Sequence, residues 1–189
     1  MLRRLALGAA LVVGASMVLV GCTPPEPTET TQPTASQSVV PTPDESQLLA
    51  SARAAWDAYR QRLTEYGAEP TSATSEGLLE VASPEVAAGL LANFEDAAER
   101  RLHTEGDRVT TAFEVSDFTA APALLKVAVC MDLTGERYVG DEGVDLTPPD
   151  RPDERGSVVE LVRSESGSDY VVAGESELDA SDPVNPCDF

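Results

Sequence analysis

The hydrophobic repeat of this chain changes once, and the change restricts the fold more than any other feature. Between residues 48 and 102, apolar side chains recur at steps of three and four residues, as on one face of a helix. From residue 109 they alternate with polar side chains, as in strands that bury one face. Helical segments followed by strand segments are typical of an α+β domain.

The first helical segment is expected to start after Asp44, with Gln47 three residues later as in a capping box, and to end near Gly67 and Pro70. Its aromatic side chains are expected to pack in the core, with the lining of a pocket as the alternative. The apolar stripe comprises Leu48, Leu49, Ala52, Ala55, Trp56, Tyr59, Leu63 and Tyr66.

A second helix is predicted from Pro84, with Ser83 as its N-cap, to Leu102, before Gly106. Its last turn would hold His103, the only histidine, where a cation complements the helix dipole. A general-base role for this histidine is the alternative. The short apolar piece between the two helices, residues 78–81, fits a helical turn or a short edge strand.

Four alternating or apolar segments predict strands, at residues 109–115, 125–133, 158–163 and 170–173. Residues 165–168 resemble a hairpin turn between the last two, and residues 134–156 read as a loop rich in glycine, proline and acid. The expected architecture is therefore α+β, with the N-terminal helices packed on one face of a curved antiparallel sheet of about four strands.

The N-terminus has the parts of an export signal: Arg3 and Arg4, then an apolar run over residues 5–20 that is shorter than the about 20 residues of a membrane-spanning helix. The run ends in Leu19-Val20-Gly21-Cys22, which resembles the lipobox of bacterial lipoproteins. The resemblance implies that residues 1–21 are a signal peptide and that Cys22 carries lipid. The protein would then sit on the extracytoplasmic face of the cell membrane; an uncleaved anchor helix or an ordinary secretory signal is the alternative.

Residues 22–43 are dominated by threonine and proline, and such a composition predicts an extended, disordered tether. Residues 44–189, about 145 residues, then remain for one domain, which is long enough to bury a core. The formal net charge of −20 argues against nucleic acid as a partner, because no surplus of basic residues exists to neutralise phosphates.

Cys130 and Cys187 are the two cysteines left if Cys22 is lipidated, and an oxidising compartment favours a disulfide between them. Cys130 lies on the opposite face of its strand from Val127 and Val129, so it could receive the C-terminal tail. Two free structural thiols are the alternative. A redox role is not expected, because the chain lacks a C-x-x-C motif.

Two helices followed by about four strands, with Val129-Cys130-Met131-Asp132 in the long strand and Cys187 near the end, resemble the NTF2-like (cystatin-like) cone fold of SnoaL-type cyclases and ketosteroid isomerase. They are also similar to actinobacterial lipoproteins that carry such a domain behind a Thr/Pro tether. The resemblance covers roughly residues 44–180. Enzymes of this family place an acid or base inside the cone, and the carboxylates available for that role are Asp132, Asp117 and Glu114.

Motifs for other chemistry are not found. One histidine cannot form a multi-histidine zinc site, and the sequence contains no G-x-S-x-G, G-x-G-x-x-G or Walker loop. The acidic loop from Asp141 to Glu154 offers calcium ligands, but its spacing does not match an EF-hand, and a solvated acidic loop explains it better. We therefore expect no cofactor and no metal.

These observations favour a membrane-anchored lipoprotein whose folded domain is a non-catalytic binding or scaffolding module of the cell envelope, with an unknown envelope protein as partner. The alternative is a carrier of a small apolar ligand, such as a lipid or cell-wall precursor, in an enclosed apolar cavity of at least roughly 300 Å³. A third hypothesis is a SnoaL- or isomerase-like enzyme, which requires a carboxylate such as Asp132 to face that cavity with a raised pKa.

Overall fold

The computed structural model describes residues 45–119, 123–164, 167 and 169–187, which belong to one compact unit, residues 41–189. The predicted lipidation residue, Cys22, and the predicted helix cap, Asp44, lie outside the described residues. In the part of the chain that is described, no helix has both the length and the apolar character needed to cross a membrane.

The helices come first, as predicted, and they are α1 (Glu45–Ala68), α2 (Ser75–Leu79) and α3 (Pro84–Glu99), with a 3-10 turn at Pro70–Ser72. Ser83 caps α3, since its side chain accepts a hydrogen bond from the backbone N of Val86 at 3.5 Å. Residues 78–81 form a helical turn that leads to a contact with an edge strand of the sheet. Val81 accepts a bond from the N of Val172 at 3.0 Å, next to a parallel bridge between Ala82 and Val172.

The second helix is shorter than the sequence indicates, and His103 lies in a strand instead of its last turn. The helix ends at Glu99, and Arg101 then adopts a left-handed backbone conformation with φ of 55°. Leu102 donates from its backbone N to the O of Ala97 at 2.8 Å, which closes the helix end. The chain therefore turns out of the helical path two residues before His103, and the predicted dipole interaction of this histidine is wrong.

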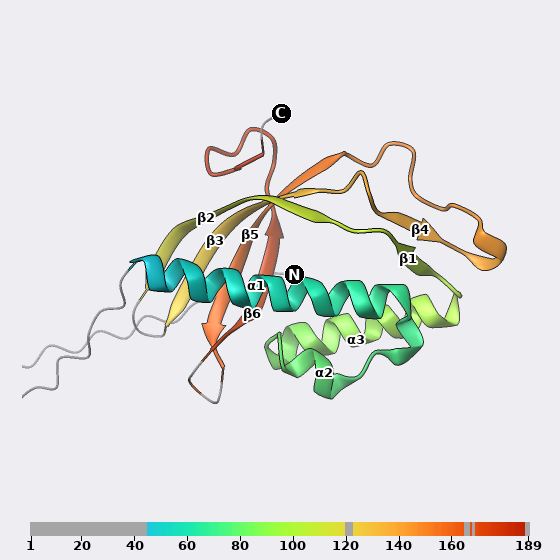
Figure 1. The fold of residues 1–189 in the computed structure, drawn as a ribbon, viewed down its shortest axis with the longest axis horizontal. Coiled ribbons are helices and arrows are strands. Elements are labelled where there is room, and N and C mark those ends of the chain that lie inside the picture. The colour runs from blue at the N-terminus through green and yellow to red at the C-terminus, as the bar shows by residue number, and fades with distance from the viewer. Residues whose placement is uncertain (1–44, 120–122, 165–166, 168, 188–189) are drawn as a thin grey trace, which may run out of the picture. The chain divides into compact units, whose positions relative to one another are not determined.

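The sheet contains four antiparallel strands in the order β2-β3-β5-β6, as expected for the α+β architecture. Their bounds are β2 (Val109–Thr119), β3 (Leu124–Asp132), β5 (Glu154–Arg163) and β6 (Tyr170–Glu177). The sheet is curved and not closed, and α1 runs across the same face that α2 and α3 flank (Figure 1). The helices therefore cover one face of the sheet.

The predicted alternation of β2 is confirmed at Phe113 and Val115, which pack against the core, but not at the start of the strand. The register against β3 shifts between Thr110 and Ala112, so Thr111 is an extra residue in the strand. Val109, expected on the core face, is consequently 54% exposed, whereas Thr110 faces the core and accepts a hydrogen bond from the indole N of Trp56 at 2.9 Å. A bulge changes which side chains face inward without changing the hydrophobic composition of the strand.

A second, two-stranded sheet was not predicted: one of its strands lies in the region expected to be a loop, and the other begins at His103, which was expected in the last turn of the second helix. It pairs β1 (His103–Glu105) with β4 (Arg137–Val139), and a short 3-10 turn, Asp141–Gly143, follows β4. The pair extends away from the four-stranded sheet beyond the C-terminal end of α1 (Figure 1). Only three residues of each strand pair, which is too short for an alternating pattern to be recognised in the sequence.

The core fills the space between the helices and the concave face of the sheet. The predicted aromatic residues of α1 are part of it, with Trp56, Tyr59 and Tyr66 exposed by 8% or less. The predicted alternation of β3 is confirmed by the buried side chains Leu125, Val127, Val129 and Met131.

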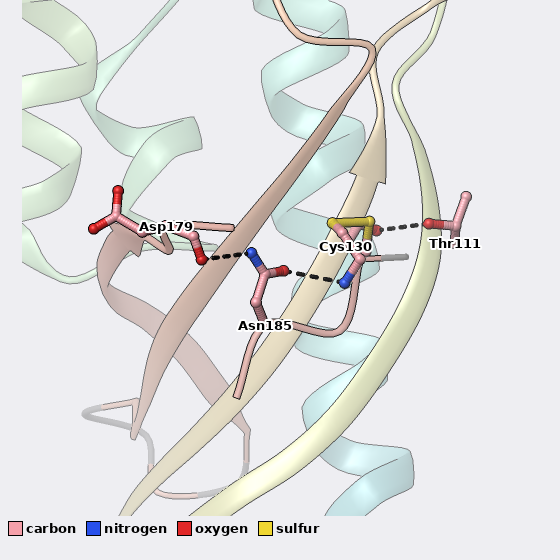
Figure 2. The surroundings of a disulfide bond; sticks show 5 residues. Thr111, Cys130, Asp179 and Asn185 are labelled. Atoms are coloured by element: carbon pink, nitrogen blue, oxygen red, sulfur yellow. Dashed lines mark hydrogen bonds between the residues drawn. A yellow bond between two sulfur atoms is a disulfide. The ribbon is translucent and has the colours of Figure 1, made fainter. Parts of the chain in front are cut away.

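The other face of β3 carries the predicted disulfide. Cys130 and Cys187 are joined, with their Cα atoms 5.1 Å apart, and Cys130 is 1% exposed. Figure 2 shows how Asn185 holds the tail at this point: its side chain donates to the O of Asp179 and accepts from the backbone N of Cys187, both at 3.0 Å. A Cβ atom at Gly156 would clash with the Asn185 side chain, so glycine permits the tail to lie directly on β5.

Candidate functional site

A cleft of about 530 Å³ opens to solvent between the C-terminal halves of α1 and α3, the β1–β4 pair and one end of the four-stranded sheet. Its volume lies within the range of small-molecule sites, roughly 300–1,000 Å³. Among the predicted site residues, His103 and Tyr59 reach it. The cleft divides into an apolar wall from the helices and a polar wall from the strands and Arg60.

The apolar wall continues the hydrophobic stripes of the two long helices. Its side chains follow one another at helical spacing on α3 and meet a leucine of α1 and one from the segment before β1: Leu63, Leu90, Phe94, Ala97 and Leu102. Phe94 is oriented by an edge-to-face contact with Tyr66, with ring centroids 5.7 Å apart. The wall is therefore fixed by the core behind it.

The polar wall is organised around one buried carboxylate, Glu136, which is 6% exposed. Arg108 donates from its Nε to Glu136 and from its Nη2 to the hydroxyl of Tyr138 at 3.2 Å. Arg151 lies on the other side of Glu136: it donates to the backbone O of Leu133 and of Glu136 itself, both at 2.7 Å, and its Nη1 is 3.5 Å from the carboxylate. Burial lowers the pKa of Arg108, but the contact with Glu136 outweighs burial and the net shift is upward.

Arg60 is the unusual member of the cleft, because no carboxylate or hydrogen-bond acceptor among the described residues contacts its guanidinium. The guanidinium carbon of Arg60 lies over the ring of Trp56, 5.9 Å from the ring centroid. Burial lowers the pKa of Arg60, the charge of Arg108 lowers it further, and the carboxylates of Glu175 and Glu136 act in the opposite direction. An arginine titrates so far above neutrality that Arg60 still carries its charge at pH 7.

Two other polar side chains of the cleft are unusual: Arg155 lacks one hydrogen-bond partner, and Tyr59 has a raised pKa. Arg155 contacts Glu177 through Nη2 at 3.2 Å, yet its buried Nε has no partner. Burial, with a smaller effect of the Glu175 charge, raises the pKa of Tyr59 to about 12. Tyr59 therefore presents a neutral hydroxyl beside the guanidiniums at any physiological pH.

The carboxylates proposed from the sequence as a catalytic acid or base are not in this cleft. Asp132 accepts two hydrogen bonds from Thr134, from the side chain at 2.6 Å and from the backbone at 2.8 Å, and these lower its pKa. Glu114 and Asp117 are exposed on β2. The raised pKa that the enzyme hypothesis requires of Asp132 is contradicted by the hydrogen bonds of that residue.

The acidic loop from residue 141 to 154 does not gather into a metal site. Asp141 contacts Arg101 at 3.1 Å, and Asp145 accepts a bond from the backbone N of Thr147 at 2.9 Å. Over the described ranges, the one grouping close enough to hold a metal ion consists of Cys130, Cys187 and Glu154. Because the two sulfurs are bonded to each other, they are not available as thiolate ligands.

Sequence reasoning did not find the arginines of the cleft. Arg60, Arg108 and Arg155 come from α1, the turn before β2 and β5, and nearly 50 residues separate each from the next. No spacing rule connects side chains at such separations. The one available signal is the position of Arg60 directly beside Tyr59, at the border of the apolar stripe of α1.

Comparisons with known proteins bear on the fold alone. No family model matches the chain, and no curated protein matches it either. The intermembrane-space region of the chloroplast protein ARC6 superposes with a TM-score of 0.51 at 14% identity, over 74% of this chain and all of that one. A candidate aromatic ring hydroxylase from Novosphingobium aromaticivorans superposes over 68% of this chain and 92% of its own, with a TM-score of 0.41 and 14% identity. The first likeness supports the α+β arrangement, and the second is too distant to carry an argument.

Proposed function

We propose that the protein is an extracytoplasmic lipoprotein, anchored through Cys22, whose domain of the NTF2-like kind is a non-catalytic binding module of the cell envelope. The observation that carries the binding role is the open cleft. It combines an apolar wall with charged groups, and one of these, Arg60, has no partner within the described residues. A charged group that the fold leaves half-buried and unpaired costs stability unless a ligand or water contacts it.

The carrier hypothesis is favoured in part by the same cleft. Its volume of about 530 Å³ exceeds the roughly 300 Å³ expected of a ligand cavity. Its walls are only half apolar, however, and it opens to solvent, so an entirely apolar ligand would leave Arg60 unpaired. A binding module for a molecule with both polar and apolar parts agrees better with these walls than a carrier of a purely apolar one.

Native mass spectrometry of protein exported by a bacterial host tests the binding role. We expect a reproducible adduct of several hundred daltons that is released unchanged on unfolding. A bare protein in gentle preparations would contradict the proposal, and an adduct whose mass changes during incubation would contradict its non-catalytic part.

Metabolic labelling with radioactive palmitate tests the anchor. The full chain and a Cys187→Ala control should both incorporate label, whereas Cys22→Ala should incorporate none, since its thiol is the predicted acceptor. Label in Cys22→Ala would refute the lipobox interpretation while leaving the cleft untouched.

A further inference from the structure

The charges around the cleft do not balance, and the imbalance is local. The charged side chains lining it are Arg60, Arg100, Arg108, Arg155, Asp96, Glu136 and Glu175. Arg100 pairs with Asp96 at 3.2 Å, and Arg108 pairs with Glu136. These two pairs use two of the three carboxylates. A positive surplus therefore remains in a protein whose net charge is −20.

The surplus is concentrated on two arginines. The single carboxylate left for Arg60 is Glu175, which acts on it through space without a contact, and the positive charge of Arg108 has the larger effect on its pKa. Arg155 uses one nitrogen for Glu177 outside the cleft, and its buried Nε has no acceptor. Arg60 thus keeps its donors for an acceptor that the described residues do not provide, and Arg155 adds a second guanidinium to the lining of the same cleft.

The chemistry of the missing acceptor follows from these donors. A guanidinium presents N–H groups in a planar fork that matches a carboxylate or phosphate, and such charge-assisted bonds are about twice as strong as neutral ones. The hydroxyl of Tyr59, protonated up to a pKa of about 12, and the hydroxyl of Tyr138 add neutral donors beside the fork. Salt weakens the attraction between charges at an exposed surface, but it weakens the attraction between an anion and a half-buried guanidinium much less.

The apolar wall restricts what is attached to that anion. Leu63, Leu90 and Phe94 line the part of the cleft that belongs to the helices, while the arginines line the part that belongs to α1 and the sheet. One molecule that fills the cleft therefore contacts both. An inorganic anion alone would leave the three apolar side chains in contact with water, and an uncharged lipid would leave the guanidinium of Arg60 unpaired.

We propose that the cleft binds a small amphipathic anion, with a carboxylate or phosphate head on Arg60 and an apolar body against Leu63, Leu90 and Phe94. This inference rests on the proposed binding role and names the ligand class of the same cleft. Carboxylate and phosphate heads share the recognition chemistry, and the experiment separates them.

Calorimetric titration of residues 41–189, the compact unit that contains the whole core, provides the test. The probes are decanoate and decyl phosphate below their micelle concentrations, decanol below its solubility limit, and inorganic phosphate. We expect one of the two anionic amphiphiles to bind at least ten-fold more tightly than decanol and than inorganic phosphate, and the better of the two identifies the head group. The fluorescence of Trp56, the only tryptophan, should change on binding because Arg60 lies over its ring.

Matched variants separate the two halves of the cleft. Arg60→Gln should weaken the anionic amphiphile at least ten-fold and leave decanol unchanged, since only the anion loses a charge-assisted hydrogen bond. Phe94→Ala should weaken the amphiphile without affecting inorganic phosphate. Arg53→Gln, an exposed arginine of the same helix that pairs with Asp57, should bind like the unsubstituted protein.

The results also distinguish this inference from the proposed function. Equal binding of decanol and decanoate, or an Arg60→Gln variant that binds decanoate normally, would overturn the anionic ligand while leaving a binding cleft. Binding of none of the probes would overturn the anionic ligand as well; the mass-spectrometric adduct would then decide the binding role independently.

Discussion

The disulfide between Cys130 and Cys187 is expected to stabilise the domain more than any single hydrogen bond, and its contribution can be calculated from the chain it closes. The two cysteines are 57 residues apart. In the chain-entropy treatment, closing a loop of that length removes about 4 kcal/mol of conformational freedom from the unfolded chain at 25 °C. Replacing both by alanine should therefore lower the free energy of unfolding by about 4 kcal/mol.

Urea unfolding of residues 41–189 measures this difference. With a slope near 2 kcal/mol per molar urea, which is ordinary for a small domain, the midpoint should fall by about 2 M in the double variant Cys130→Ala, Cys187→Ala. The slope itself should rise slightly, because an unfolded chain without the cross-link exposes more surface. Under a reducing agent, the unsubstituted protein should unfold close to the midpoint of the double variant.

Two results would refute this reasoning. Equal midpoints for the oxidised protein and the double variant would mean that the closed loop is not the source of stability. Two alkylatable thiols in the native protein, detected by mass, would mean that the bond does not form in solution.

Three further predictions concern the core and the polar wall of the cleft. Glu136→Ala removes the buried carboxylate that contacts two arginines and should lower the free energy of unfolding in urea by about 3–5 kcal/mol. The control Glu105→Ala, which breaks an exposed ion pair, should lower it by less than about 1 kcal/mol. Similar losses for both variants would contradict a special role of the buried network. Thr110→Val removes the acceptor of the fully buried Trp56 indole and should destabilise by about 1–3 kcal/mol, and an unchanged midpoint would show that the indole finds another acceptor. The pKa of Tyr59 is raised from 10 to about 12, so the contribution of the neutral phenol to stability is complete below pH 10 and is lost as pH rises toward 12. Ultraviolet titration of Tyr59→Phe should therefore lack the most alkaline phenolate step of the unsubstituted protein. Retention of that step would contradict the assignment.

How much of the fold the sequence predicts depends on how local the signal is. The first helix and the long strand were predicted almost to their ends, because each repeats one period over many residues, and Trp56 and Val129 lie in the core as expected. Phe113 and Val115 of β2 pack against the core as expected, but the inward face at the start of the strand was missed because one extra residue, Thr111, shifts the faces there without altering the composition. His103 was misplaced because the helix ends through the backbone conformation of Arg101, which no residue type announces.

The candidate site was harder to predict than the fold, for a physical reason. The cysteine pairing could be inferred because only two thiols remain if Cys22 carries lipid, and the structure confirms the pairing. The cleft instead depends on tertiary packing: its arginines come from separate elements, and an unpaired Arg60 looks in the sequence like any exposed charge on a helix. Pairing and its absence are properties of the folded surroundings, so they become visible only when all the neighbours are in place.

The length of α1 has a consequence for how the protein is handled and presented. The helix starts at Glu45, and the cleft is built from its other half, beginning at Tyr59; at about 1.5 Å per residue, the leucine at position 63 lies about 27 Å along the axis from the first turn. The C-terminal tail, in turn, is fixed by its disulfide to the face of the sheet that the helices do not cover. Attachment to a surface through the residues that precede α1 therefore leaves the part of the cleft built on α1 more than half a helix length from the point of attachment. A biosensor chip coupled at that end should capture ligand from solution as readily as the free domain does.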